Sequence, residues 1–150
     1  MSYHHLPLPL PLHIAIIDDQ REDIRLIEQG FIELQYQVRV SSCEHGPDGA
    51  LLLMDLAQQS DCPDLVLIDI RMPRTSGFEV LRQLRLQGIL VTTPIIMMTS
   101  QLQPGYLECA TALGACDLLV KPRSMDDLLL QLVRTINLHC PFQLAGRDAN

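Results

Sequence analysis

The feature that most constrains this chain is an alternation of short apolar runs with segments whose apolar residues recur at helical spacing. The apolar runs are His13–Asp18, Val38–Cys43, Leu65–Ile70, Pro94–Thr99 and Asp117–Val120. Short runs rich in branched residues are typical of strands buried on both faces. Strands that alternate with helices across short joints predict a parallel sheet with helices on both sides and right-handed crossovers. We therefore predict an α/β fold, a flavodoxin-like (βα)5 doubly wound parallel sheet with strand order 2-1-3-4-5.

Turn and cap signals separate the helical segments. The first helix follows the first strand, and its charged face, which includes Asp23, is expected to be solvated. We expect the remaining helices over Ala50–Gln59, from Ser76 to about Gln87, over roughly Gly105–Leu113, and after a cap at Ser124. The Gly46-Pro47-Asp48-Gly49 segment predicts a turn before the second of these helices. The strand Val38–Cys43 is the most polar, which places it at or near an edge of the sheet.

The chain divides into an arm, one domain and a tail. At 150 residues it is long enough for a single core, which we assign to residues 13–139, with a Pro/Leu arm at 1–12 and a tail at 140–150. In the arm, proline at every second position of Leu6–Leu12 favours an extended polyproline-like segment. Two interpretations remain open: a mobile tail, or an arm whose leucines pack on a neighbouring subunit.

Charge and composition narrow the classes of partner. The formal net charge is −7 and there is no block of Lys or Arg, which argues against nucleic acid or a membrane surface as primary partner. The five cysteines are scattered without a Cys-x-x-Cys pair, as expected of reduced thiols. The apolar N-terminal stretch is broken by prolines and lacks the features of a signal peptide. We therefore expect a cytoplasmic protein.

Polar residues stand where four of the predicted strands end. They are Asp18 and Asp19 after the first strand, Asp69 at the end of the third, Thr99 at the end of the fourth and Lys121 after the fifth. Each has an ordinary alternative, because an Asp at a strand end often caps the next helix and a Lys there is usually solvated. In the order 2-1-3-4-5, however, the first and third strands are neighbours at the switch point, so the three carboxylates converge.

Converging carboxylates repel each other unless a cation lies among them. An oxygen-rich site with open positions suits Mg²⁺, which also bridges to phosphate. A carboxylate beside Mg²⁺ can attack phosphorus and form an aspartyl phosphate. The metal and the Lys121 ammonium would neutralise the phosphoryl charge, and the Thr99 hydroxyl could donate a hydrogen bond to a phosphoryl oxygen.

A family resemblance rests on these residues and their neighbours. The motifs are Asp18-Asp19, the run Asp69-Ile70-Arg71-Met72-Pro73 with Gly77 beyond it, the Pro94–Thr99 segment, and Gly114-Ala115 leading to Lys121-Pro122. In this order and spacing, the sequence resembles the receiver domain of two-component response regulators across about Ile14 to Leu138. The resemblance implies that Asp69 accepts a phosphoryl group from a phosphohistidine on a sensor histidine kinase. It also implies that Thr99 is the switch hydroxyl and that Lys121 contacts the phosphate.

The same resemblance implies the metal ligands. Asp19 and Asp69 would bind Mg²⁺ directly, together with the backbone carbonyl of Arg71, while Asp18 would act largely through water. The side chain of Arg71 is a departure at the mouth of the site. It is either solvated, or it shields the acyl phosphate from water or contacts the phosphoryl group.

A second departure concerns the readout of phosphorylation. Many receivers carry Tyr or Phe three residues before the lysine, and this chain has Leu118 there. A ring that turns inward as Thr99 moves is therefore absent. The stretch after Leu138 is too short for an output domain, so we expect the response to be a change in binding to an unknown protein target, a relay partner or a second copy of the chain. Stand-alone regulators of phytochrome-type kinases are the suspected subgroup.

Two rival interpretations remain. A haloacid-dehalogenase-like phosphatase also uses an Asp at a strand end, but that family places a second Asp two residues later, where this chain has Arg71. A degenerate receiver would bind partners without phosphorylation. Leu118 keeps that alternative open, and the intact set of site residues argues against it. In neither the main interpretation nor the degenerate one is the chain an enzyme, apart from self-catalysed phosphotransfer and autodephosphorylation.

Overall fold

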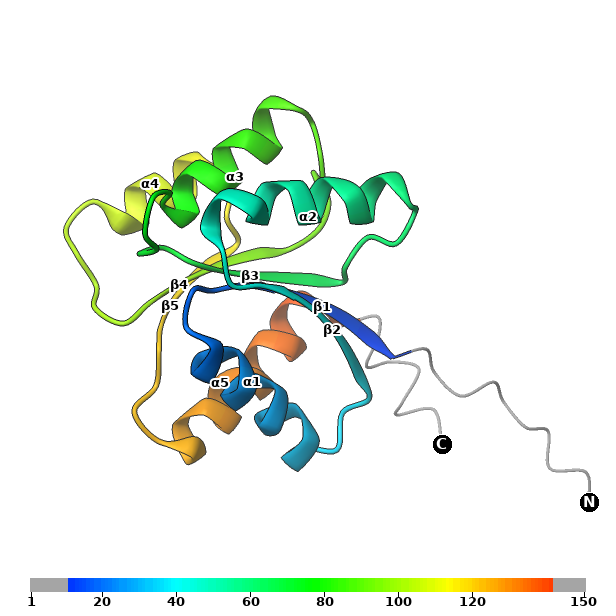
Figure 1. The fold of residues 1–150 in the computed structure, drawn as a ribbon. Helices are drawn as coiled ribbons and strands as arrows, with labels where there is room; N and C mark the ends of the chain where they lie inside the picture. Colours follow the sequence, from blue (N-terminus) through cyan, green and yellow to red (C-terminus); the bar gives the residue numbers. More distant parts are fainter. Residues whose placement is uncertain (1–10, 142–150) are drawn as a thin grey trace, which may run out of the picture.

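A five-stranded parallel sheet lies at the centre of the computed structural model, which describes residues 11–141 (Figure 1). Its strands are β1 (Leu12–Ile17), β2 (Val38–Cys43), β3 (Leu65–Asp69), β4 (Ile95–Thr99) and β5 (Asp117–Val120). The observed order β2-β1-β3-β4-β5 confirms the predicted topology and the edge position of β2. The predicted arm at 1–12 and tail at 140–150 lie mostly outside the described residues, so their structure stays a prediction.

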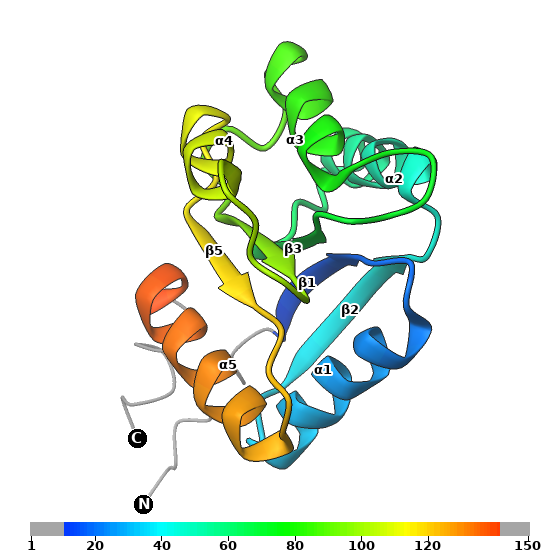
Figure 2. The ribbon, with the colours of Figure 1, turned by 90° about the vertical axis from the view of Figure 1, so that its left-hand side faces the viewer.

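Helices cover both faces of the sheet. Below it in Figure 1 lie α1 (Arg21–Glu33) and α5 (Met125–His139), and above it lie α2 (Gly46–Gln58), α3 (Gly77–Leu86) and α4 (Tyr106–Ala112). Figure 2 shows the same two layers from the side. Each helix between two strands therefore carries the chain over one face of the sheet, from the edge where one strand ends back to the edge where the next strand begins, so all five strands end at the same edge.

Two apolar cores follow from this layering. Ile14 and Ile16 of β1 pack with Phe31 of α1 on one face, whereas Ala15 and Ile17 belong to the core under α2 and α3. All four strand residues are fully buried. Successive side chains of a strand point to opposite faces, so a strand covered on both sides is apolar throughout. This explains the unbroken apolar runs of the sequence.

The second helix differs from its prediction. The segment Gly46–Gly49 was predicted as a turn, but α2 begins at Gly46 and includes it. Pro47 occupies the first turn, where its missing amide hydrogen and fixed φ angle do not disturb helical hydrogen bonding. The Pro-Gly pattern therefore marks a helix start rather than a separate turn.

All five cysteines, which lie within the described residues, are free thiols, and no helix among those residues is long and apolar enough to cross a membrane.

The start of α3 is fitted closely to the end of β3. Ser76 caps the helix, and its hydroxyl oxygen accepts a hydrogen bond from the Glu79 amide at 3.3 Å. The Gly77 amide donates to the Ile70 carbonyl at 2.9 Å. A Cβ atom at Gly77 would collide with the backbone carbonyl of Asp69. Glycine at this position therefore allows the helix to approach the strand that carries the central carboxylate.

We expect Gly77→Ala to lower the free energy of unfolding by about 1–3 kcal/mol, because the new methyl group meets backbone rather than a side chain that can move. Urea denaturation monitored by circular dichroism measures this change. Arg82→Ala, on the exposed side of the same helix, is the matched control and should change stability by less than about 0.5 kcal/mol. Equal stabilities of wild type and Gly77→Ala would contradict the close fit.

Candidate functional site: an acidic pocket at the carboxyl edge of the sheet

The three predicted carboxylates lie close together at the carboxyl ends of β1 and β3. Asp18 and Asp19 follow β1, and Asp69 is the last residue of β3. The two strands are neighbours, with Ile17 opposite Ile68. One oxygen atom from each carboxylate lies within 4.8 Å of the others. Because Asp18 and Asp69 are buried, their charges are poorly screened by solvent, and they need a cationic partner.

Lys121 supplies that partner in the structure. Its Nζ lies 2.8 Å from an Asp18 carboxylate oxygen and 3.5 Å from an Asp69 oxygen. A third carboxylate, that of Asp23, accepts from the same ammonium at 2.7 Å. Although burial favours the neutral amine, the hydrogen bonds to Asp18 and Asp23 raise the pKa of Lys121 above its usual value. The lysine is thus charged, and its ammonium links the carboxylates of Asp18, Asp23 and Asp69.

Asp23 is a site residue that the sequence did not predict. Its position on the charged face of α1 predicted a solvated carboxylate, whereas its side chain is only half-exposed and holds Lys121. The available signal was its place in the first turn of α1, directly after β1, which puts it at the edge of the sheet where the strands end. Helical periodicity identifies the polar face of a helix and gives no indication of which polar residue a distant lysine will reach.

Burial shapes the titration of the acids. It raises the pKa of Asp69 to about 7, an effect that Lys121 opposes and that the neighbouring Asp18 and Asp19 charges reinforce. Burial also raises the pKa of Asp18, against its hydrogen bonds from Lys121 and the Gln20 amide. One lysine therefore compensates only part of the clustered negative charge, and a divalent cation would stabilise the ionised forms.

The other predicted residues lie around this pocket. Thr99 ends β4 and is fully buried, and its hydroxyl donates to the Gln101 carbonyl at 2.9 Å, so it engages the following loop rather than an acid. Arg71 lies two residues beyond Asp69 with an exposed side chain. Leu118 of β5 pairs with Met97 of β4 and packs on the core beneath α2, α3 and α4. The fold brings Thr99 to the predicted edge, where its hydroxyl bonds to Gln101.

The donor set fits a magnesium ion. Asp19 carries a buried carboxylate oxygen, Oδ1, that has no hydrogen-bond partner among the described residues. An unpaired buried carboxylate oxygen is costly unless a ligand satisfies it. Three carboxylates within 4.8 Å offer the hard oxygen ligands that Mg²⁺ prefers. Asp18, Asp19 and Asp69 are therefore the residues that could hold the ion.

Comparison with known proteins shows that the chain is similar to response regulators. Residues 14–133 match the family model of the response regulator receiver domain. Response regulator MprA of Mycolicibacterium vanbaalenii is 31% identical over 140 residues, which cover 93% of this chain and 57% of that protein. Two-component response regulator ARR14 of Arabidopsis thaliana is 33% identical over 121 residues, 80% of this chain and 30% of that protein. The chain thus spans less than two thirds of the length of either relative.

Solved structures agree with the fold. The phosphorylated cyanobacterial phytochrome response regulator RcpA matches with a TM-score of 0.75 and 19% identity, covering 87% of this chain and 94% of that one. The chemotaxis protein CheY4 of Vibrio cholerae matches with a TM-score of 0.66 and 27% identity, covering 83% and 98%.

Fold and site together define the class: a doubly wound α/β protein with an acidic, lysine-bridged pocket at the switch point of its sheet. The chain belongs to the response regulator receiver family, the signal-transduction module of two-component systems. The predicted family is therefore confirmed, and with it the CheY-like fold.

The raised pKa of Asp69 predicts how stability depends on pH. The folded state holds a proton on Asp69 up to about pH 7, while the unfolded chain releases it near pH 4. Between about pH 4 and pH 7 the folded state binds more protons than the unfolded chain. In the presence of a metal chelator, the free energy of unfolding therefore falls as the pH rises through this range. Asp69→Asn should remove much of this slope and be about 1–3 kcal/mol more stable than wild type at pH 8.

Urea denaturation across this pH range measures the effect. Asp55→Asn, an exposed substitution on α2, is the control and should keep the wild-type slope. A slope for Asp69→Asn that equals that of wild type would contradict a carboxyl group with a raised pKa at this position.

Proposed function

We propose that Asp69 accepts a phosphoryl group from a phosphohistidine on a sensor histidine kinase, in a reaction that needs Mg²⁺. The observation that carries this proposal is the cluster of Asp18, Asp19 and Asp69 within 4.8 Å, with the Lys121 ammonium 3.5 Å from Asp69. A nucleophilic carboxylate, a metal site and a cation for the phosphoryl oxygens are the parts that phosphoryl transfer requires.

In the proposed mechanism, an Asp69 carboxylate oxygen forms a bond to phosphorus as the bond from phosphorus to the kinase histidine breaks. The histidine leaves and takes up a proton. Asp18, Asp19, Asp69 and the Arg71 carbonyl would hold the metal, which when bound neutralises charge on the acids and the phosphoryl oxygens. Lys121 would move from Asp23 to a phosphoryl oxygen, and its charge would stabilise the product.

Thr99 is the proposed switch residue. Its hydroxyl donates to the Gln101 carbonyl at 2.9 Å, and the Gln101 amide donates back at 3.3 Å. A phosphoryl oxygen on Asp69 would compete for this hydroxyl hydrogen. The loop between β4 and α4 would then lose one of the bonds that fix its conformation. Phosphorylation could thus reach the surface through this loop without an aromatic ring at Leu118.

The proposed output is a change in protein binding. The face formed by α4, β5 and α5 exposes apolar side chains, with Leu107 60%, Val120 46% and Leu130 52% accessible. Such residues suit an interface with a downstream protein or with a second copy of the chain.

We place these events in the cytoplasm, and we assign no nucleic acid and no membrane as partner. Phytochrome-type kinases are the first to test, since RcpA is described as a phytochrome response regulator.

The alternatives receive less support. A haloacid-dehalogenase-like phosphatase needs an acid two residues after Asp69, where Arg71 stands. A degenerate receiver would have no use for a buried acid cluster with an unpartnered oxygen on Asp19. Beyond self-catalysed phosphotransfer and autodephosphorylation, we assign the chain no enzymatic activity.

Phosphorylation of the purified chain tests the proposal. With Mg²⁺ and acetyl phosphate, we expect mass spectrometry to show one added phosphoryl group, which hydroxylamine removes. Asp69→Asn should abolish it, chelator should prevent it, and Asp64→Asn, at the opposite edge of the sheet, should leave it unchanged. No adduct on the folded wild type, or an equal adduct on Asp69→Asn, would refute Asp69 as the acceptor and favour the degenerate alternative.

The side chain of Arg71 is expected to affect the lifetime of the acyl phosphate on Asp69. If its side chain shields the acyl phosphate, Arg71→Ala should speed autodephosphorylation by roughly tenfold, equivalent to about 1.4 kcal/mol of transition-state free energy. The decay of the phosphorylated protein after removal of acetyl phosphate measures this rate. Arg74→Ala, an exposed arginine of the same loop, is the matched control. An unchanged rate in Arg71→Ala would show that Arg71 is simply solvated.

A further inference from the structure

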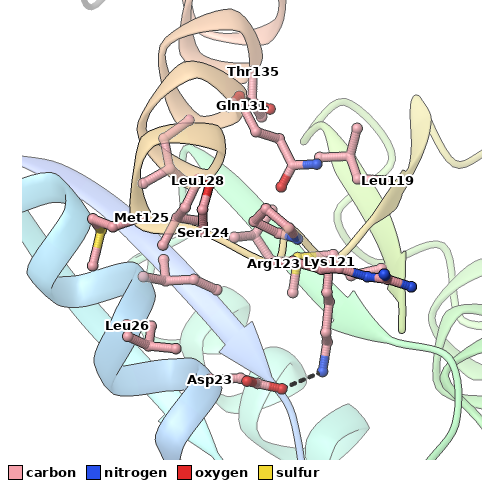
Figure 3. A pocket seen from close by; sticks show the side chains of 15 residues that line it. Asp23, Leu26, Leu119, Lys121, Arg123, Ser124, Met125, Leu128, Gln131 and Thr135 are labelled. Atoms are coloured by element: carbon pink, nitrogen blue, oxygen red, sulfur yellow. Dashed lines mark hydrogen bonds and ion pairs between the residues drawn. The ribbon is translucent and has the colours of Figure 1, made fainter. Parts of the chain in front are cut away.

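A cavity that the phosphoryl chemistry does not use lies between α1 and α5. Its volume is about 190 Å³, and it is bounded by the sheet on one side and by the two helices on the others (Figure 3). Its walls are mainly apolar and come from five elements; they include Ile27, Leu67, Met98, Leu119, Leu128 and Leu132. The charged side chains lie toward one end, which we call the polar end, where Figure 3 shows Lys121 paired with Asp23; Gln131 and Thr135 lie farther along α5.

Apart from the exposed Arg123, the polar side chains in the walls already have protein partners. The Thr135 hydroxyl donates to the Gln131 carbonyl at 2.8 Å, and the Gln131 side-chain amide donates to the Val120 carbonyl at 2.9 Å. Ser124 accepts from the Asp127 amide at 3.1 Å. Among the described residues, the buried side-chain atoms without partners lie elsewhere, on His13, Asp19 and His139. Water gains little in such a space, because it needs two to four polar partners, so the cavity favours an apolar occupant.

The volume sets the size of that occupant. An engineered apolar cavity of about 150 Å³ in another protein stays dry and binds benzene. A cavity of about 190 Å³ therefore accommodates one aromatic ring or a short branched chain. Filling it would recover dispersion contacts that the surrounding side chains lack.

The charged residues at the polar end determine which charge a bound ligand would carry there. Arg123 lines the cavity and is exposed, and it makes no ion pair within residues 11–141. The Asp23 carboxylate at the same end is already paired with Lys121. The first turn of α5, capped by Ser124, also presents its positive end there. Of the three charged residues that line the cavity, Asp23, Lys121 and Arg123, only Arg123 has no ion-pair partner among the described residues, and this unpaired positive charge favours an anionic group.

We propose that this cavity binds a small apolar carboxylate, with a ring or short branched chain between α1 and α5 and the carboxylate beside Arg123. The site is separate from the acidic pocket but shares Lys121 with it. A carboxylate at the cavity end would attract the ammonium that a phosphoryl group on Asp69 also needs. The ligand would therefore oppose phosphorylation, a consequence that rests on the proposed function, whereas the binding itself does not.

Benzoate, toluene and benzylamine are the probes for the binding site, with the ¹³C-labelled methyl groups of Met98 and Met125 as the readout. We expect saturable shifts of both methyl signals, with benzoate bound roughly two- to fivefold more tightly than benzylamine. Shifts with toluene but an equal or greater affinity for benzylamine would overturn the anionic head group. No saturable shift with any of the three probes would overturn the site.

Substitutions locate the probe. Leu128→Phe should fill the cavity and weaken benzoate binding at least about tenfold; Leu119→Phe is the second filling variant if the first does not fold by circular dichroism. Arg123→Gln should remove the preference for benzoate over benzylamine, whereas Arg134→Gln, an exposed arginine of α5 outside this cavity, should keep it. Unchanged affinity in a folded filling variant would place the probe elsewhere and refute the proposal.

Competition tests the link to the acidic pocket. In the presence of Mg²⁺, benzoate should weaken the binding of beryllofluoride, and beryllofluoride should weaken that of benzoate by the same factor. Benzoate binding without any effect on bound beryllofluoride would retain the site and refute the regulation. A protein that binds benzoate but never binds beryllofluoride would instead refute the proposed function.

Discussion

The structure depends on one electrostatic constraint, the burial of like charges at the switch point of a parallel sheet. Asp18, Asp19 and Asp69 converge because β1 and β3 are neighbours that end at the same edge. Two of these carboxylates are almost fully removed from water, and the Lys121 ammonium bridges them across the end of the sheet. Without a cation, the arrangement would be strongly unfavourable. The clustered charge is therefore offset by the lysine, by a proton on Asp69 below about pH 7, or by a metal ion.

Asp23 changes how this balance is understood. Lys121 is 2.7 Å from Asp23 and 3.5 Å from Asp69, so in this structure the lysine is held closer to α1 than to the proposed phosphoacceptor. A phosphoryl group would have to draw the ammonium away from Asp23. The same movement would alter the polar end of the cavity between α1 and α5, which Lys121 and Asp23 form together. One ion pair thus connects two sites that are otherwise separate.

Most of the fold could be predicted from the sequence, because apolar runs that alternate with helices across short joints favour a doubly wound parallel sheet covered on both faces. The convergence of Asp18, Asp19 and Asp69 followed from strand order. Three features could not be predicted. The start of α2 at Gly46 was hidden by a Pro-Gly pattern that suits both a turn and a first helical turn. The partners of Asp23 and the Thr99 hydroxyl depend on side-chain directions that periodicity does not specify. The cavity depends on how closely α1 and α5 approach.

The most direct test of this account is a crystal structure of the chain with Mg²⁺ and beryllofluoride. We expect beryllium bonded to a carboxylate oxygen of Asp69, the metal on Asp18, Asp19 or both, and the Lys121 ammonium moved from Asp23 to within hydrogen-bond distance of a fluoride. A structure in which Lys121 stays paired with Asp23 while beryllofluoride is absent from Asp69, under conditions that saturate the metal site, would contradict it.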